Sequence, residues 1–145
     1  MLINESISIS GNPESIWIYW MDVTNDIQWR NGITKAEWTS RPPFGIGSTG
    51  EHTHKDMGVL IWEVTRFEDG RSFEFIHIAG GLKGSIAIFQ VEPENNGSRV
   101  QVQMRMSGPF IMRFMMFFMG NTMRKGVRGD LQKLKELIEN QKTNA

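Results

Sequence analysis

Residues 109–140 read PFIMRFMMFFMGNTMRKGVRGDLQKLKELIEN and include the most apolar segment of the chain. Nine of the ten residues from Phe110 to Met119 are apolar. After Gly120, apolar residues recur at steps of three and four, which places them on one face of an α-helix: Met123, Val127, Leu131, Leu134 and Ile138. This second half predicts a core helix. The first half is far shorter than the roughly 20 apolar residues that cross a bilayer, so we expect it to cover another part of the protein.

Length and composition predict one domain spanning residues 1–145. Sixteen basic and sixteen acidic residues cancel, so the chain lacks the positive charge that binds nucleic acid. It contains no cysteine, which excludes a disulfide or a thiolate ligand and suits a reducing compartment. The first residues lack the basic start and apolar run of a secretory signal, so we expect a cytoplasmic protein.

Upstream of the helix, the pattern predicts strands with one interruption. Residues 2–10 alternate between apolar and polar, as in a strand with one buried face. Asn12 and Pro13 are suited to begin a short helix, and a further helical turn carries Trp29 before Asn31 and Gly32 end it. From Ile33 onward, six strand-like segments alternate with turn-forming residues.

Strands joined by tight turns form an antiparallel meander, and only the C-terminal helix is long enough to cover its apolar face. The predicted fold is therefore α+β. It has a seven-stranded antiparallel sheet gripping a long C-terminal helix, with two short helices between strands 1 and 2. The inward positions mix large apolar side chains with three histidines, which suits a concave pocket better than a dry core.

Four segments occur in a fixed order along the chain. They are Pro13–Trp17 followed by Asp22–Asn25 and Trp29, then Pro43–Ser48, Trp62–Thr65 and Asp130–Lys135. In this order they resemble the START-like (SRPBCC) superfamily, and specifically its polyketide cyclase/dehydrase and lipid-transport branch. The resemblance covers nearly the whole chain and implies a helix-grip fold, in which a deep hydrophobic cavity lies between the curved sheet and the last helix. It implies a scaffold rather than one chemistry, because the family has no universal catalytic motif.

The inward faces of the predicted strands and helices supply the candidate ligand-binding residues. These are Trp29, His52, His54, Trp62, Phe75, His77, Phe89, Met104, Met106, Phe114, Phe118 and Leu131. His52 and His54 are alternate strand residues that share a face, an arrangement that can bind a metal. A cupin-type site would add an acidic ligand a few residues on, whereas this chain runs into a turn there. We therefore expect no metal and no cofactor, and we interpret the two histidines as a hydrogen-bonded pair that lines the pocket.

Three residues are candidates for catalysis: His77, His54 and Asp130. His77 shares an inward face with Phe73 and Phe75, and a histidine in an apolar pocket can act as general acid or base near neutral pH. Asp130 lies at the edge of the apolar stripe of the last helix, where it could meet a histidine or a ligand hydroxyl. Each also has a plainer interpretation, because His77 can simply bond a neighbour and a carboxylate such as Asp130 is usually solvated.

Three interpretations of residues 110–119 are open. As a lid, their side chains would close the pocket, and glycines at 120, 126 and 129 would weaken the helix enough to let the lid bend. As an oligomer contact, the segment would pair with its own copy in a homodimer. As an interfacial helix it would dip into lipid, although Arg113 provides little polar face and we expect no stable membrane insertion. We favour the lid.

These features together predict a protein that binds a hydrophobic small molecule, such as a lipid, a polyketide or an aromatic metabolite. The alternative is an enzyme of the cyclase or dehydrase type that uses a cavity histidine as acid or base. A third hypothesis is a lidded interaction protein with an empty pocket. The first two differ in whether titratable groups converge on one reactive point, so the question of enzyme activity depends on their geometry.

Overall fold

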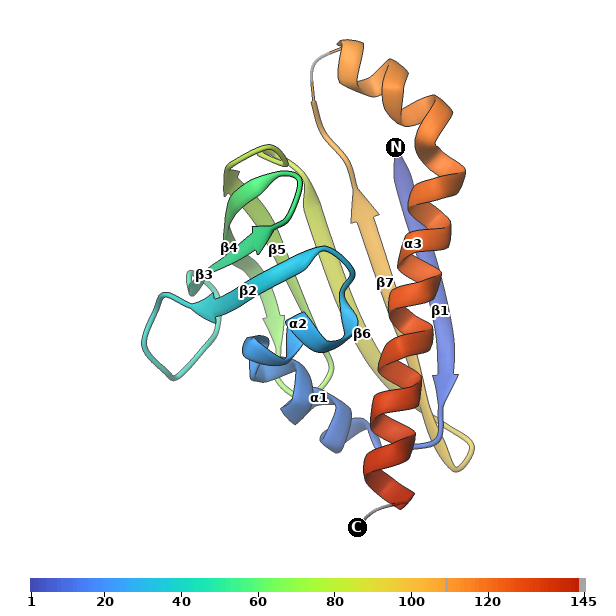
Figure 1. Cartoon of the computed structure of the whole chain (residues 1–145). Coiled ribbons are helices and arrows are strands. Elements are labelled where there is room, and N and C mark those ends of the chain that lie inside the picture. Colours follow the sequence, from blue (N-terminus) through green and yellow to red (C-terminus); the bar gives the residue numbers. More distant parts are fainter. Residues whose placement is uncertain (109, 144–145) are drawn as a thin grey trace.

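The computed structural model describes residues 1–108 and 110–143, and of residues 110–116 and 142–143 it describes the backbone alone. The strands are β1 (Leu2–Ile9), β2 (Ile33–Trp38), β3 (Thr49–His54), β4 (Gly58–Glu68), β5 (Ser72–Ala79), β6 (Ile86–Glu94) and β7 (Gly97–Arg105). The helices are α1 (Pro13–Met21), the 3-10 turn η1 (Val23–Asn25), α2 (Asp26–Trp29) and α3 (Phe110–Thr143). This order confirms the predicted α+β architecture (Figure 1).

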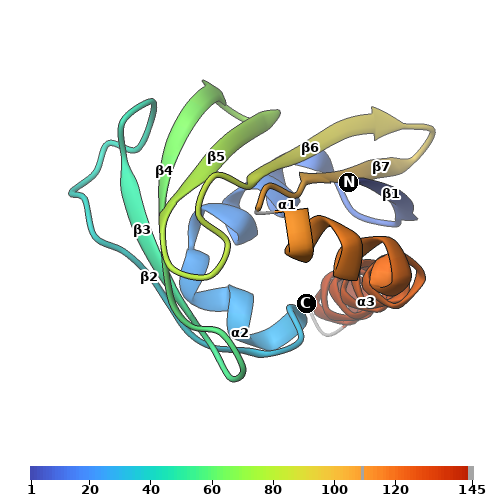
Figure 2. The ribbon, with the colours of Figure 1, turned by 90° about the horizontal axis from the view of Figure 1, so that it is seen from above.

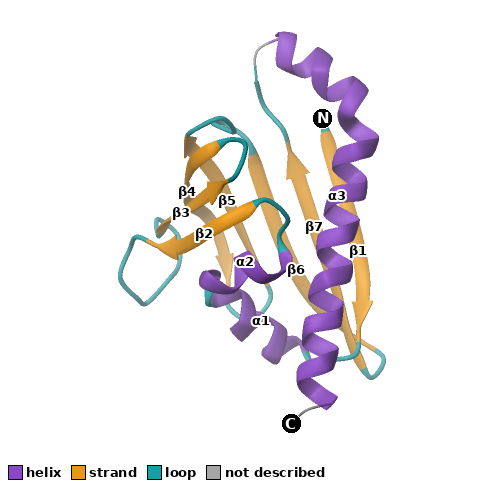
Figure 3. Ribbon diagram, viewed as in Figure 1, coloured by secondary structure: helices purple, strands orange, loops and turns teal. Residues whose placement is uncertain are grey.

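The seven strands form one antiparallel sheet in the order β1-β7-β6-β5-β4-β3-β2. Strands β2 to β7 follow one another as a meander, and β1 completes the sheet by pairing with β7 from Leu2↔Arg105 to Ile9↔Ser98. Seen from above, the sheet curls so that all the helices lie on its concave side (Figure 2). Figure 3 shows the same arrangement by type of element, with the short helices at one end of the concave face and α3 along one side.

The short helices begin where side chains satisfy their free backbone N–H groups. The Oδ1 atom of Asn12 accepts a hydrogen bond from the backbone N–H of Ser15 at 2.7 Å, and Pro13 occupies the first turn. Asp22 accepts from the backbone N–H of Thr24 at the start of η1. These caps turn the chain from β1 across the concave face and place α2 opposite β3.

An aromatic core fills the end of the concave face beneath α1. Trp20 packs edge-on against Phe73 and Phe89, with ring centroids 6.3 and 5.7 Å apart. Trp17 also packs edge-on against Phe73, and its indole N–H donates to Asp69 at 3.1 Å. Edge-to-face pairs of this kind stabilise a core beyond the area they bury. Both tryptophans belong to the buried core.

Helix α3 packs along β1 through its second half. Leu131, Leu134 and Ile138 are buried, as the helical spacing predicts. Polar contacts fix the same face, since Arg128 Nε donates to Glu5 at 2.8 Å and Lys135 Nζ donates to the backbone carbonyl of Ser8 at 2.8 Å.

The first turns of α3 extend past the end of the sheet (Figure 1). Among the side chains described there, Phe117 and Phe118 are 80% and 70% exposed, and Met119 is also exposed. Across residues 1–108 and 110–143, no helix has both the length and the apolar character that a membrane span requires.

Candidate functional site

A cavity of about 230 Å³ lies between the concave face of the sheet, α2 and the second half of α3. Most of the residues that were predicted as a site, because they fall on the inward faces of strands and helices, line this cavity. Nine of them line it: Trp29, His52, His54, His77, Phe89, Met104, Met106, Asp130 and Leu131. The structure therefore brings all three candidate catalytic residues, His77, His54 and Asp130, to one cavity.

The other four predicted site residues are not among the described residues that line this cavity. Trp62 and Phe75 are buried in the core and line a smaller neighbouring cavity instead. Phe118 is exposed and lies outside the lining of the larger cavity. The side chain of Phe114 falls outside the described residues, as do those of most of the expected lid, so the lid stays a prediction.

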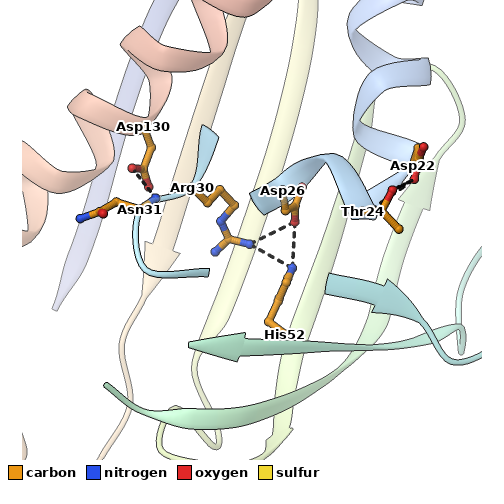
Figure 4. Close-up of polar contacts among 7 residues, drawn as sticks. All are labelled: Asp22, Thr24, Asp26, Arg30, Asn31, His52 and Asp130. Atoms are coloured by element: carbon orange, nitrogen blue, oxygen red, sulfur yellow. Dashed lines mark hydrogen bonds and ion pairs between the residues drawn. The ribbon is translucent and has the colours of Figure 1, made fainter. Parts of the chain in front are cut away.

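A buried polar cluster at the cavity wall joins α2 to β3 (Figure 4). The His52 Nε2 atom lies 2.8 Å from Asp26 Oδ2, and Arg30 Nη1 lies 3.4 Å from each of these two atoms. Asp26 and Arg30 are four residues apart and so extend from the same side of the helical turn. Because a carboxylate can only accept, a neutral His52 carries its proton on Nε2 and donates it to Asp26.

Burial keeps His52 neutral despite its acidic partner. Desolvation lowers the pKa of His52 below its usual value, and the positive charge of Arg30 acts in the same direction, while Asp26 opposes both. The Asp26 and Arg30 charges then compensate each other. The cluster is thus a neutral, hydrogen-bonded unit in which Asp26 fixes the orientation of the His52 ring.

His77 is held on β5 by the backbone of Ser85. The carbonyl of Ser85 lies 2.9 Å from the backbone nitrogen of His77 and 3.3 Å from its ring Nδ1, so it accepts from both. The side chain is only 3% exposed, and this burial is the main reason that its pKa falls to about 4. The nearby Arg30 and His52 lower the pKa further, whereas the hydrogen bond to Ser85 opposes the shift. His77 is therefore neutral near neutral pH.

His54 on β3 and Asp130 on α3 also line the cavity, and both bond to backbone groups. Nδ1 of His54 accepts from the backbone N–H of Asp56 at 3.1 Å, so His52 and His54 have different partners rather than forming the expected mutual pair. Asp130 accepts from the backbone N–H of Asn31 at 3.0 Å (Figure 4). Burial raises the pKa of Asp130, so it is not a freely solvated carboxylate. Its hydrogen bond among the described residues is to the backbone of Asn31 and not to a histidine.

Sequence reasoning missed Asp26 and Arg30. Both lie in the segment of the predicted helical turn that carries Trp29, and charged residues in such a short surface element are usually solvated. The signal that could have identified them is their spacing of four residues, which places both on one side of a helical turn. The apolar Trp29 lies between them in the sequence, and its buried ring indicates that this turn packs against the sheet. Within the described part of the chain, no three His, Asp or Glu side chains are placed to hold a metal ion.

Comparison with known proteins places the chain among proteins of the same fold. Residues 2–139 match the model of the family described as polyketide cyclase / dehydrase and lipid transport. No curated protein matches the sequence.

Among solved structures, the protein TTHA0849 from Thermus thermophilus has a TM-score of 0.76 and 15% identity, covering 97% of this chain and 98% of its own. XoxI from Bacillus cereus has a TM-score of 0.73 and 16% identity over 97% of both chains. The Aha1 dimer from Colwellia psychrerythraea has a TM-score of 0.68 and 22% identity over 96% of both chains. At these identities the solved structures show a shared fold alone.

Proposed function

Because the chain belongs to the polyketide cyclase/dehydrase and lipid-transport family, we propose that it binds a hydrophobic small molecule, such as a lipid, a polyketide or an aromatic metabolite, between the sheet and α3. The observation that carries the proposal is the cavity of about 230 Å³ at that place. Most ligand sites measure about 300–1,000 Å³, so a space of this size favours a compact ligand over a two-chain lipid.

The walls of the cavity support an apolar ligand of varied shape. Met104, Met106 and Met123 contribute flexible, polarisable side chains that adapt to different apolar surfaces. Phe89 and Trp29 add flat aromatic surfaces. Removing apolar ligand surface from water gives roughly 25 cal/mol for each Å² buried, which supplies most of the binding free energy for such a molecule.

Two glycines of α3 provide a matched test of where a ligand binds. Gly126 lines the cavity and Gly129 does not, and a Cβ added at either position meets no neighbouring atom. Gly126→Phe should therefore fill the cavity without disturbing the fold, whereas Gly129→Phe should leave it open. Equilibrium dialysis against 2-methoxynaphthalene, an apolar probe, should show binding to the wild type and to Gly129→Phe and none to Gly126→Phe.

Native mass spectrometry of the purified protein completes this test. A co-purified apolar molecule that is present in the wild type and missing from Gly126→Phe supports the proposal. If no molecule co-purifies and the probe does not bind, the protein is not a carrier of apolar ligands. Binding that persists in Gly126→Phe would place the ligand outside this cavity.

The same spectra test a homodimer. The exposed Phe117 and Phe118 on α3 are the surface that we expect self-association to use, because exposed adjacent aromatic side chains are typical of contact sites. Substituting both Phe117→Ser and Phe118→Ser should convert a dimer into a monomer. A dimer that survives this change would use another surface.

A second candidate function is an enzyme of the cyclase or dehydrase type, and the position of His77 favours it. Its neutral ring lines the cavity together with three other titratable side chains, His52, His54 and Asp130. The free ring nitrogen of a neutral histidine can remove a proton from a carbon next to a ligand carbonyl and return it after the enolate forms.

Proton exchange in deuterated water tests this second function directly. The wild type should speed the exchange of the acidic C–H protons of 2-tetralone above the buffer rate, and His77→Phe should remove that acceleration. Nuclear magnetic resonance of the ketone follows the exchange. A wild-type rate equal to that of buffer rejects proton transfer next to a carbonyl in this cavity.

A further inference from the structure

The ring of His77 has only one available hydrogen-bonding role toward the cavity. A carbonyl oxygen can only accept, so the 3.3 Å contact with Ser85 requires the proton of a neutral ring on Nδ1. The remaining nitrogen, Nε2, then carries a lone pair and acts as an acceptor. Among the described residues, Nε2 of His77 makes no hydrogen bond, and the residue lines the cavity, as do the apolar Leu60 and Met106.

The loop that holds His77 is itself anchored, which favours this position of the proton. Ser85 also bonds to the segment that follows β7, because its hydroxyl accepts from the backbone N–H of Ser107 at 3.0 Å. In addition, the backbone N–H of Gly84 donates to the carbonyl of His77 at 2.8 Å. His77 is thus fixed through its backbone and through one ring nitrogen, and the acceptor nitrogen cannot exchange roles without breaking the contact with Ser85.

His52 adds a second acceptor of the same kind. Its Nε2 proton is donated to Asp26 at 2.8 Å, so a neutral ring leaves Nδ1 as the acceptor. His52 is buried and also lines the cavity. His52 and His77 are therefore two neutral histidines on the same face of the sheet, and each has one ring nitrogen left as an acceptor.

The charged side chains of the cavity wall do not favour an anion. Among the described lining residues, Arg30 and Asp130 are the charged types. Asp26 lies 3.4 Å from Arg30 Nη1 and compensates its charge. The lining also contains a neutral donor, the buried indole N–H of Trp29, which has no hydrogen-bond partner among the described residues. An anionic head group would thus meet neutral hydrogen-bonding groups and no uncompensated cation, and these do not repay the desolvation of a full charge.

From this arrangement we propose that the cavity selects uncharged ligands that carry a hydroxyl group, and that this hydroxyl donates its hydrogen bond to Nε2 of His77. The inference rests on the proposed ligand-binding function and names the class of ligand for that same cavity. A phenol or another apolar alcohol fits, because its hydroxyl satisfies the buried acceptor while its apolar body meets the methionines. A fatty acid carboxylate or a phosphorylated head group does not fit.

Three naphthalene probes of similar size test the selection. 2-Naphthol has a hydroxyl, 2-methoxynaphthalene has the oxygen without its proton, and 2-naphthoate is anionic. By equilibrium dialysis near neutral pH, 2-naphthol should bind the wild type about tenfold more tightly than 2-methoxynaphthalene, the ratio expected for one additional hydrogen bond in a buried site. 2-Naphthoate should bind more weakly than both.

The outcomes separate this inference from the proposed function. If 2-naphthol and 2-methoxynaphthalene bind equally, or 2-naphthoate binds most tightly, the hydroxyl selection is wrong while ligand binding stands. If none of the three binds and no molecule co-purifies, both fail. His77→Phe should keep 2-methoxynaphthalene binding and lose the preference for 2-naphthol, and a preference that survives in a folded His77→Phe protein overturns the role of this residue.

A measurement on the wild-type protein tests the inference without relying on the folding of His77→Phe. Nitrogen-15 resonances of the His77 ring distinguish a proton on Nδ1 from one on Nε2. We expect a neutral ring protonated on Nδ1, with the Nε2 resonance shifting when 2-naphthol is added and staying in place with 2-methoxynaphthalene. A proton on Nε2 near neutral pH would contradict the inference.

Discussion

Strand β5 crosses two different environments on the same face of the sheet. Phe73, near its start, lies under Trp17 and Trp20 of α1 in a packed aromatic core. His77, four residues further along, faces the cavity. Both side chains are buried and follow the same alternation, so the strand itself does not distinguish them. The difference comes from what lies opposite: α1 covers the first end closely, while α2 and α3 leave space above the second.

The packed end of the concave face contributes to stability, and the cavity end is suited to binding. Close packing at the end beneath α1 maximises dispersion contacts and apolar burial. At the cavity end the same sheet keeps polar groups and space that a tighter core would exclude. Functional sites commonly depart from optimal packing in this way, so substitutions at the two ends should have opposite profiles for stability and ligand binding.

The largest effect should come from deleting a ring in the packed end. Phe73→Ala should lower the free energy of unfolding by about 3–5 kcal/mol, because a large cavity opens among rings that cannot collapse into it. Met104→Ala, at the wall of an existing cavity, should cost less than half as much. Urea denaturation measures both. Equal losses would mean that the cavity end is packed as closely as the core.

The next effect concerns the polar cluster at the boundary between the two ends. Asp26→Asn should cost about 3 kcal/mol, because it leaves the guanidinium of Arg30 partly buried without its carboxylate. Asp22→Asn is the matched control, since Asp22 is exposed and asparagine caps a helix as well as aspartate does. Urea denaturation of the two variants should therefore differ clearly. If Asp22→Asn costs as much as Asp26→Asn, the buried cluster has no special role.

Acid should weaken the cavity end by a somewhat smaller amount. The pKa of His77 is about 4 in the folded protein and 6.5 in an unfolded chain, so its contribution to stability is complete above pH 6.5 and is lost as the pH falls toward 4. The loss should reach roughly 2–3 kcal/mol. His77→Phe should flatten this part of the stability curve measured by urea denaturation at several pH values. The lowered pKa of His52 acts in the same direction, so some slope should persist. An unchanged slope in His77→Phe would show that the ring is not the group that titrates.

The smallest effect should appear on α3 away from both ends. Gly129→Ala should raise the free energy of unfolding by up to about 1 kcal/mol, because alanine favours a helix and its methyl group meets no neighbour at this position. Thermal denaturation detects a change of this size. A loss of stability instead would indicate that the helix needs the freedom of a glycine there.

Much of the fold could be predicted from the sequence because the strands have one solvent-facing and one buried face. The period of two in β4 to β7 assigned the inward side chains correctly, and the spacing of Leu131, Leu134 and Ile138 identified the buried face of α3. The asparagine cap and proline at the start of α1 were equally local signals. These features depend on residues that are close together in the sequence.

The depth of the site could not be predicted in the same way. Trp62 and His77 are paired on neighbouring strands and have the same inward phase, yet Trp62 lies in the core and His77 lines the cavity. The partnership of Asp26 with His52 joins residues that are 26 positions apart in the sequence and belong to different elements. Likewise, the apolar composition around Phe118 indicated a contact without identifying its partner. Such properties depend on which element lies opposite, and periodicity carries no information about that.

The pairing of β1 with β7 has a consequence for how the chain reaches this structure. Ser6 and Arg99 are hydrogen bonded although they are 93 residues apart, and the same two strands pair along their whole lengths. During synthesis on the ribosome, the first strand must therefore wait for nearly the entire meander before its partner emerges. The hairpins from β2 to β6 can form earlier from local contacts. Because closing such a long loop costs more entropy than closing a hairpin, we expect the pairing of β1 with β7 to be a late and slow step of folding.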